Sequence, residues 1–219
     1  MKDTALIEAT ISFVQKTLNG AEAGHDWFHT QRVFNNALLL AKEEKADVLV
    51  VSLGALLHDI ADAKFHNGDE TLGPKLAKKF LTSQGVQPNI IKQVCDIIAQ
   101  VSFKNSLGKE NDDTLSKEAQ LVQDADRLDA LGAIGIARAF HYGGFKNREL
   151  YNPAIAPNLN LTKEEYKNAD SPTINHFYEK LLLLKDKMNT TAGKKIAEQR
   201  HQFLLQYLKQ FYAEWNATT

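Results

Sequence analysis

The sequence predicts an all-α fold, a helical bundle with no confidently predicted strand. Apolar residues recur at spacings of three and four over most of the 219 residues, which is the periodicity of helices that bury one face. No run alternates apolar and polar residues for long enough to predict a strand. Because the sequence contains no internal repeat and no Gly/Ser/Pro-rich linker, we expect a single domain over residues 1–219.

Two amphipathic helices are expected near the start of the chain. The first covers residues 4–18, with Ile7, Ile11 and Val14 in its apolar stripe, and Gly20 provides a stop. The second covers residues 30–45, and its stripe continues from the preceding histidine.

A third helix is predicted to end at the pair of polar residues His58 and Asp59. Asp47 is expected to cap this helix, which is strongly apolar and runs as far as His58. Residues 61–73 are polar and predict a loop. Two further helices are expected at about 74–84 and 88–101.

The remaining helices are separated by two loops. Residues 104–115 predict a loop. The next helix is expected to start at Ser116 and to extend towards Phe140, with a bend near Gly132 and Gly135. Residues 143–160 are rich in Gly, Pro and Asn, and a loop of this length in a compact domain is usually functional or mobile. Two C-terminal helices, about 172–188 and 190–215, are expected to form a packed extension.

Composition excludes several classes of partner. The formal net charge of −1, with no basic stripe on any predicted helix, argues against nucleic-acid binding. No apolar run is long enough to span a bilayer, so no membrane partner is expected. The N-terminus lacks the apolar region of a signal peptide, and the single Cys95 cannot form an intramolecular disulfide. A cytoplasmic protein is therefore expected, and a homodimer is left open.

Two histidines and two aspartates predict a metal site. His29 opens one helix, His58 and Asp59 end the next, and Asp126 lies on the inner face of a later helix. A carboxylate directed into a core is costly unless it is paired or bound to metal. A mixed nitrogen and oxygen set suits a divalent ion such as Mn²⁺, Mg²⁺, Fe²⁺, Ni²⁺, Co²⁺ or Zn²⁺ without selecting among them. Mn²⁺ is our first expectation.

Three longer strings around these residues resemble a known family, the HD-domain superfamily of metal-dependent phosphohydrolases. A more specific resemblance is to small bacterial YpgQ/YedJ-type proteins, and it spans about residues 20–205. The strings are His25-Asp26-Trp27-x-His29-x-x-Arg32-Val33, His58-Asp59-Ile60-Ala61-Asp62 and Gln123-Asp124-Ala125-Asp126-Arg127-Leu128-Asp129-Ala130, together with Tyr142-Gly143-Gly144 and Met188-Asn189-Thr190-x-x-Gly193-Lys194.

The resemblance implies an HD core over about residues 20–140 and a set of functional roles. It implies that the four residues above are the metal ligands, with Asp126 chosen over Asp124. It implies that Asp62 acts as the general acid or base, with a solvated loop aspartate as the competing interpretation. The implied reaction is pyrophosphohydrolysis of a nucleoside triphosphate to a monophosphate and pyrophosphate.

The candidates for substrate binding are basic or aromatic. Arg32 lies one helical turn after His29 and can face the same site. The full set of candidates for phosphate and base contacts is Arg32, Lys64, His66, Arg138, Tyr142 and Lys180. Trp27 and Phe28 could also stack on a base, but core packing is the expected role of both.

Other functions stay open on the sequence alone. A phosphomonoesterase or phosphodiesterase acting on another small phosphate ester would need the same residues. A non-catalytic nucleotide sensor would bind metal and nucleotide without turnover. A purely structural helical scaffold would bind no metal at all.

Overall fold

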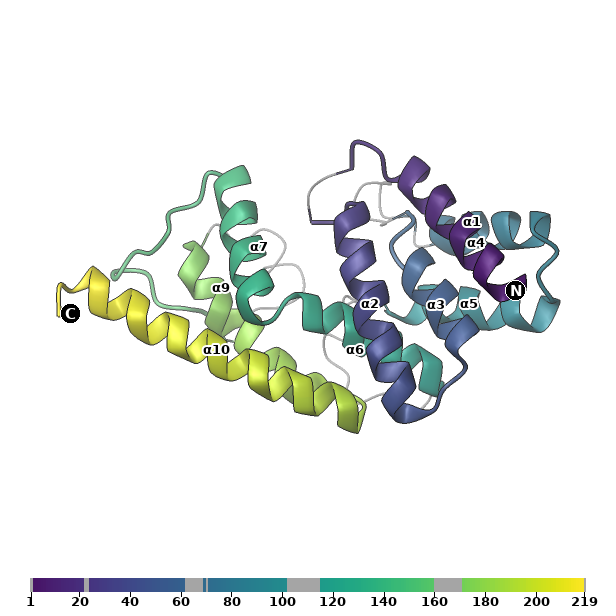
Figure 1. Cartoon of the computed structure of the whole chain (residues 1–219). Coiled ribbons are helices and arrows are strands. Elements are labelled where there is room, and N and C mark those ends of the chain that lie inside the picture. Colours follow the sequence, from purple (N-terminus) through teal and green to yellow (C-terminus); the bar gives the residue numbers. More distant parts are fainter. Residues whose placement is uncertain are drawn as a thin grey trace. The chain divides into compact units, whose positions relative to one another are not determined.

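The computed structural model describes residues 2–21, 24–61, 69, 71–101, 115–159 and 171–218. Every regular element within these residues is a helix, which confirms the predicted all-α fold for them. Their contacts divide the chain into two compact units, Met1–Asp126 and Arg127–Thr219, and each is described by itself below (Figure 1). The single domain with a C-terminal extension stays a prediction.

The first unit is built from helices whose bounds lie close to the predicted ones. They are α1 (Lys2–Thr17), α2 (Trp27–Glu44), α3 (Val48–Leu57), α4 (Leu72–Ser83), α5 (Pro88–Val101) and the greater part of α6 (Lys117–Asp129). Helix α3 packs against α1, α2 and α5, and α4 packs against α5. Helix α3 is therefore the central element of this unit.

Helix α3 is apolar around its whole circumference because it is enclosed on all sides. The side chains from Val50 to Leu57 are all buried, as expected of a helix without a polar face. The predicted cap is confirmed: the Asp47 carboxylate accepts hydrogen bonds from the backbone N–H groups of Leu49 and Val50. His58 and Asp59 follow directly after Leu57, the last residue of this buried helix.

The second unit contains α7 (Gly132–Phe145), α9 (Thr173–Glu179), the 3₁₀-helix η3 (Leu181–Lys187) and α10 (Thr191–Trp215). The prediction of one continuous helix over 172–188 is wrong. Lys180 leaves the helical conformation, with φ −142° and ψ −58°, between α9 and η3. In η3 the buried residues are Leu181 and Leu184, which lie three positions apart, one turn of a 3₁₀-helix.

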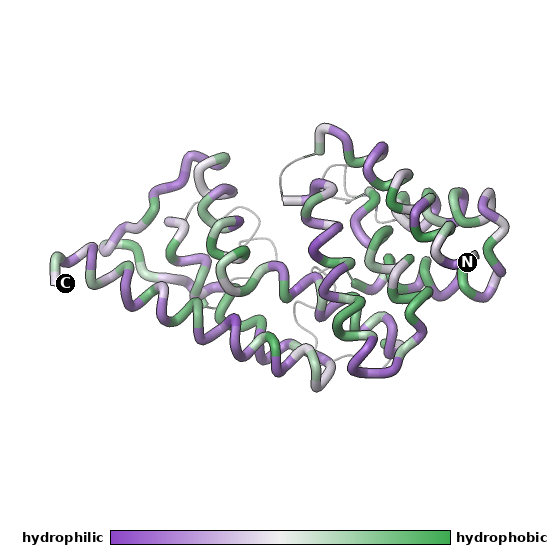
Figure 2. Tube along the Cα trace, viewed as in Figure 1, coloured by the Kyte–Doolittle hydropathy of each residue, from purple (hydrophilic) through white to green (hydrophobic). Residues whose placement is uncertain are grey.

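An aromatic core holds the second unit together. Phe177 is fully buried; its ring stacks on that of Tyr207 from α10, with centroids 5.8 Å apart, and lies 5.9 Å from that of Phe140 from α7. Figure 2 shows hydrophobic and hydrophilic residues alternating along α10, as expected of a helix with one buried face. The side chain of Thr190 caps α10 by accepting from the Gly193 N–H at 3.0 Å, which confirms its predicted start.

The junction between α6 and α7 is a full break rather than the predicted bend. Gly132 has φ +69°, a left-handed conformation that glycine adopts without steric cost. Two arginines bind backbone oxygens around this break: Arg200 donates to the Leu128 carbonyl at 2.6 Å, and Arg127 donates to the Lys187 carbonyl. These contacts satisfy carbonyls that a terminating helix would leave unpaired.

Gly135 makes a close backbone contact that gives the first testable prediction. A Cβ at this position would lie 2.3 Å from the carbonyl oxygen of Ala130, a backbone atom that cannot rotate away. We expect Gly135→Ala to lower the free energy of unfolding by about 1–3 kcal/mol, the usual cost of overpacking. Chemical denaturation of the purified variant measures this change.

Gly144 in the same helix is the matched control. A Cβ there would meet no atom within 4 Å, so Gly144→Ala should be neutral or add up to about 1 kcal/mol through helix propensity. Equal free energies of unfolding for the two alanine variants would contradict the proposed contact.

Membrane insertion finds no support in the described helices. None of them combines enough length with enough apolar character to cross a bilayer.

Candidate metal centre

His29 is held at the start of α2 by a capping interaction. The Asp26 carboxylate accepts a hydrogen bond from the His29 backbone N–H at 2.9 Å. The His29 side chain is 2% exposed, and its Nε2 atom faces the carboxylate of Asp126. A polar ring this deeply buried needs a partner for its nitrogen atoms, because an unpaired buried polar atom is costly.

His58 lies at the C-terminal end of α3 and has a defined tautomer. Its Nδ1 atom is 2.8 Å from the carbonyl oxygen of Ala55. Because a carbonyl only accepts, Nδ1 carries the proton and Nε2 presents a lone pair. Within the described part of the chain, this buried Nε2 atom has no hydrogen-bond partner. A backbone contact that fixes one imidazole nitrogen while the other faces a cation is typical of metal-binding histidines.

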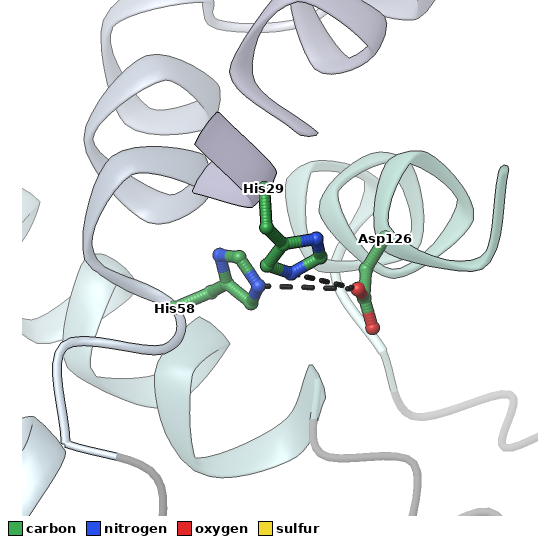
Figure 3. Close-up of side chains that lie close together, drawn as sticks. All are labelled: His29, His58 and Asp126. Atoms are coloured by element: carbon green, nitrogen blue, oxygen red, sulfur yellow. Dashed lines mark ion pairs between the residues drawn. The ribbon is translucent and has the colours of Figure 1, made fainter. Parts of the chain in front are cut away.

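Asp126 on α6 completes a cluster of three side chains. Its Oδ1 atom lies 3.5 Å from His29 Nε2 and 4.0 Å from His58 Nε2, and Figure 3 shows both rings directed at this carboxylate. The candidate ligand atoms of the three residues all lie within 4.8 Å of one another.

The spacing in this cluster fits a shared metal ion. Bonds from nitrogen and oxygen ligands to a small divalent ion are about 2.0–2.2 Å long, so two ligands of one ion lie at most about 4.4 Å apart. Both measured separations from Asp126 fall within this limit. Together with the unpaired lone pair of His58, these distances show that the residues present fit a divalent cation.

Asp59 lies beside the cluster but is bound to another residue. Its Oδ2 atom is 3.9 Å from His29 Nε2. The same oxygen accepts a hydrogen bond from Nδ1 of His25 at 2.5 Å. The structure therefore brings three of the four predicted ligands into one group and places the fourth next to His29.

The surroundings of Asp59 favour its ionised form. Burial acts to raise the pKa of this carboxyl. The hydrogen bond with His25 and the electrostatic interactions with the three nearby imidazoles outweigh burial and hold the pKa well below its usual range. Asp59 is therefore an anion throughout the neutral pH range.

His25 is a site residue that the sequence reasoning missed. It is in none of the sets of candidate site residues above, yet it contacts a predicted metal ligand directly. A signal was present in the sequence, because His25 stands only four residues before His29 and directly precedes Asp26, the N-cap of α2. That signal was insufficient because its partner, Asp59, is 34 positions further along the chain.

Three of the predicted site residues lie outside the described residues. They are the proposed general acid or base, Asp62, and the phosphate-contact candidates Lys64 and His66. Their roles stay predictions.

The other predicted substrate contacts lie on α2 and in the second unit. Arg32 is half-buried on α2, one turn after His29. In the second unit, Lys180 occupies the break between α9 and η3, and Tyr142 is half-buried in α7. The Tyr142 ring lies 5.6 Å from the Arg148 guanidinium and 5.8 Å from the Lys146 ammonium.

Arg138 has a structural partner. Its guanidinium donates to the carboxylate of Asp129 at 2.7 Å and to the Asp129 backbone carbonyl at 3.2 Å. The Asp129 side chain is 2% exposed. Because Arg138 balances a buried charge at the end of α6, a phosphate contact for it stays a prediction from the sequence.

Comparison with known proteins gives a consistent picture. Residues 27–131 match the pattern of the HD domain. The chain is 37% identical to the Bacillus subtilis protein YpgQ over 212 residues, which are 96% of this chain and 94% of YpgQ.

Solved structures agree over nearly the whole chain. A Lactobacillus plantarum protein superposes with a TM-score of 0.81 at 39% identity, covering 97% of this chain and 98% of its own. A Bacillus thuringiensis HD-superfamily hydrolase gives 0.79 at 43% identity, covering 98% and 99%. YpgQ in complex with ADP gives 0.78 at 34% identity, covering 98% and 97%.

Proposed function

Because this chain belongs to the HD-domain family of metal-dependent phosphohydrolases, we propose that it hydrolyses nucleoside triphosphates to monophosphates and pyrophosphate. The observation that carries the proposal is the convergence of His29, His58 and Asp126 on one point, with a buried lone pair on His58. A nucleotide substrate is supported by the ADP complex of YpgQ. A cytoplasmic setting belongs to the same proposal.

We assign the metal site to the three clustered residues together with Asp59. The mixed nitrogen and oxygen donors suit several divalent ions, among which Mn²⁺ is our first choice. Bound there, the ion would make water nucleophilic near neutral pH and polarise a phosphoryl oxygen. Four protein ligands leave open positions for water and substrate if the ion is six-coordinate.

The protein residues keep this site ready for an anionic substrate. The contact of His58 with the Ala55 carbonyl fixes the ring orientation, so the lone pair does not need to rotate into place. The hydrogen bond of His25 likewise fixes the orientation of the Asp59 carboxylate. A site that is organised in advance loses little energy to rearrangement during the reaction.

Several residues predicted from the sequence have proposed roles in the reaction. We assign proton transfer to Asp62, three positions after the His-Asp pair. Arg32, Lys64 and His66 are proposed to neutralise charge that develops on the phosphoryl groups. From the sequence, Arg138 and Lys180 are proposed to contact phosphate as well, and Tyr142 is proposed to stack on the base.

A hydrolysis screen with identified products tests the proposed function. Purified protein with Mn²⁺ is incubated with a nucleoside triphosphate, and the products are separated by ion-exchange chromatography. The proposal requires monophosphate and pyrophosphate. Release of nucleoside diphosphate and orthophosphate, or turnover of phosphate esters alone, would instead support a different phosphohydrolase. Nucleotide binding without turnover, whichever substrate and metal are tested, would support a sensor.

His25 gives a prediction for the metal site itself. We expect His25→Ala to weaken metal binding by about 10–100-fold, the usual effect of removing a residue that orients a ligand. Isothermal titration of metal-free protein with Mn²⁺ measures the affinity. His141→Ala, which removes an exposed histidine from α7, is the matched control and should bind like the wild type. Unchanged Mn²⁺ affinity in His25→Ala would show that Asp59 needs no such support.

A further inference from the structure

Phe28, the second residue of α2, is an exposed aromatic residue next to the metal site. Its neighbour Trp27 packs against the hydrophobic core of the first unit, as predicted for both residues. Phe28 is 63% exposed, so the predicted core packing is wrong for it. Single exposed apolar side chains are common on proteins, and exposure alone therefore indicates no function. The location of Phe28 on α2 decides whether its ring can contact a ligand of the metal site.

The position of Phe28 links it to two charged or ligating groups. It directly precedes His29, so the two Cα atoms are about 3.8 Å apart. Successive residues of an α-helix are rotated by about 100° around its axis. Arg32 follows Phe28 by four positions and His29 by three, and so lies on the face between them. One side of α2 therefore presents a ligand imidazole, a guanidinium and an exposed aromatic ring in order.

We propose that Phe28 stacks on the base of the nucleotide whose phosphates are bound beside His29 and Arg32. The inference rests on the proposed function and adds to it how the base is recognised. In a nucleotide, a sugar separates the anionic phosphates from the aromatic base. Helix α2 presents a cationic group and an aromatic ring in the same order. Core packing does not account for this ring, because the buried stripe of α2 begins at His29 and continues through Val33 and Ala37, and Phe28 lies outside it.

Recognition by stacking predicts a particular kind of specificity. Every nucleobase has a π-face, so stacking tolerates different bases and gives little discrimination through hydrogen bonds. A purine covers more of a phenyl ring than a pyrimidine does. We therefore expect broad base tolerance with tighter binding of purine nucleotides.

Leu39 provides a control on the same helix. It is also exposed, at 48%, and lies eleven residues after Phe28, close to the same helical face. The axial distance between the two is about 16 Å, too far for both to contact one base beside His29. Removing Leu39 therefore tests the effect of losing an exposed apolar side chain from α2 without changing the site.

The experiment compares two ligands that share a diphosphate but differ in the nucleoside. Isothermal titration with Mn²⁺ present measures the Kd of ADP and the Kd of inorganic pyrophosphate for the wild type, Phe28→Ala, Phe28→Trp and Leu39→Ala. We expect Phe28→Ala to raise the Kd of ADP about 10-fold, as for the loss of one base-stacking residue. The Kd of pyrophosphate should stay the same, Phe28→Trp should bind ADP like the wild type, and Leu39→Ala should change neither.

Each other outcome has a distinct meaning. An unchanged Kd of ADP in Phe28→Ala would overturn the stacking inference and leave the proposed function intact. Equal weakening of ADP and pyrophosphate would overturn it as well, because Phe28 would then support the phosphate site and not the base. If the wild-type protein bound neither ligand, the proposed function would fail, and the inference would fail with it.

Discussion

Asp126→Ala is expected to abolish metal binding and hydrolysis together while leaving the helices intact. Asp126 contributes the carboxylate that both buried imidazoles face, at 3.5 and 4.0 Å. Replacing a residue that only orients a ligand costs about 10–100-fold in affinity or activity, so removal of a ligand should exceed about 100-fold. The side chain is 28% exposed, so its loss leaves no sealed cavity. Metal content, nucleotide turnover and circular dichroism are the measurements.

Two further variants show whether such a result is specific. His58→Ala should match Asp126→Ala, because it removes the Nε2 atom that faces the Asp126 carboxylate. Asp96→Ala, in α5 of the same unit, removes an exposed aspartate that pairs with Lys92 and should behave like the wild type. Wild-type turnover in Asp126→Ala would rule out the site assignment.

Arg138→Met is expected to destabilise the protein by about 3 kcal/mol, because it leaves the buried Asp129 carboxylate without this partner. Breaking a buried ion pair costs about 3–5 kcal/mol. We expect the lower end of that range, since the Arg138 side chain is 26% exposed. Chemical denaturation measures the change in the free energy of unfolding.

The same variant separates a structural role from a substrate-binding one. If Arg138 acts only through Asp129, its folded variant should keep the wild-type KM for nucleotide. If it also binds phosphate, the KM should rise. Lys185→Met is the matched control, because its pair with Glu198 is exposed and exposed ion pairs contribute little to stability. Similar destabilisation of the two methionine variants would contradict a special role for the Arg138–Asp129 pair.

Local sequence signals predicted most of the helices. Asp47 and Thr190 each cap a helix with their own side chain, so the information for these helix starts lies within three residues. The apolar run of α3 predicted a helix that delivers His58 and Asp59 to its end. The order of the His and Asp residues along the chain also predicted a metal site.

Features that depend on partners distant in the sequence could not be predicted in the same way. The contact of His25 with Asp59 and that of Arg138 with Asp129 depend on how side chains from separate segments meet. The break at Lys180 lies in a stretch without Gly or Pro, so no local stop signal in the sequence indicates it. Phe28 was predicted to be in the core because aromatic residues usually are, whereas the helix buries its opposite side.

Metal analysis of the purified wild-type protein, paired with identification of the products released from a nucleoside triphosphate, tests the central claim most directly. Our account predicts about one divalent ion per chain, release of pyrophosphate, loss of both after chelation, and recovery of both when Mn²⁺ is added back. Pyrophosphate release that persists in fully metal-free protein would contradict it. So would a chain that binds no divalent ion.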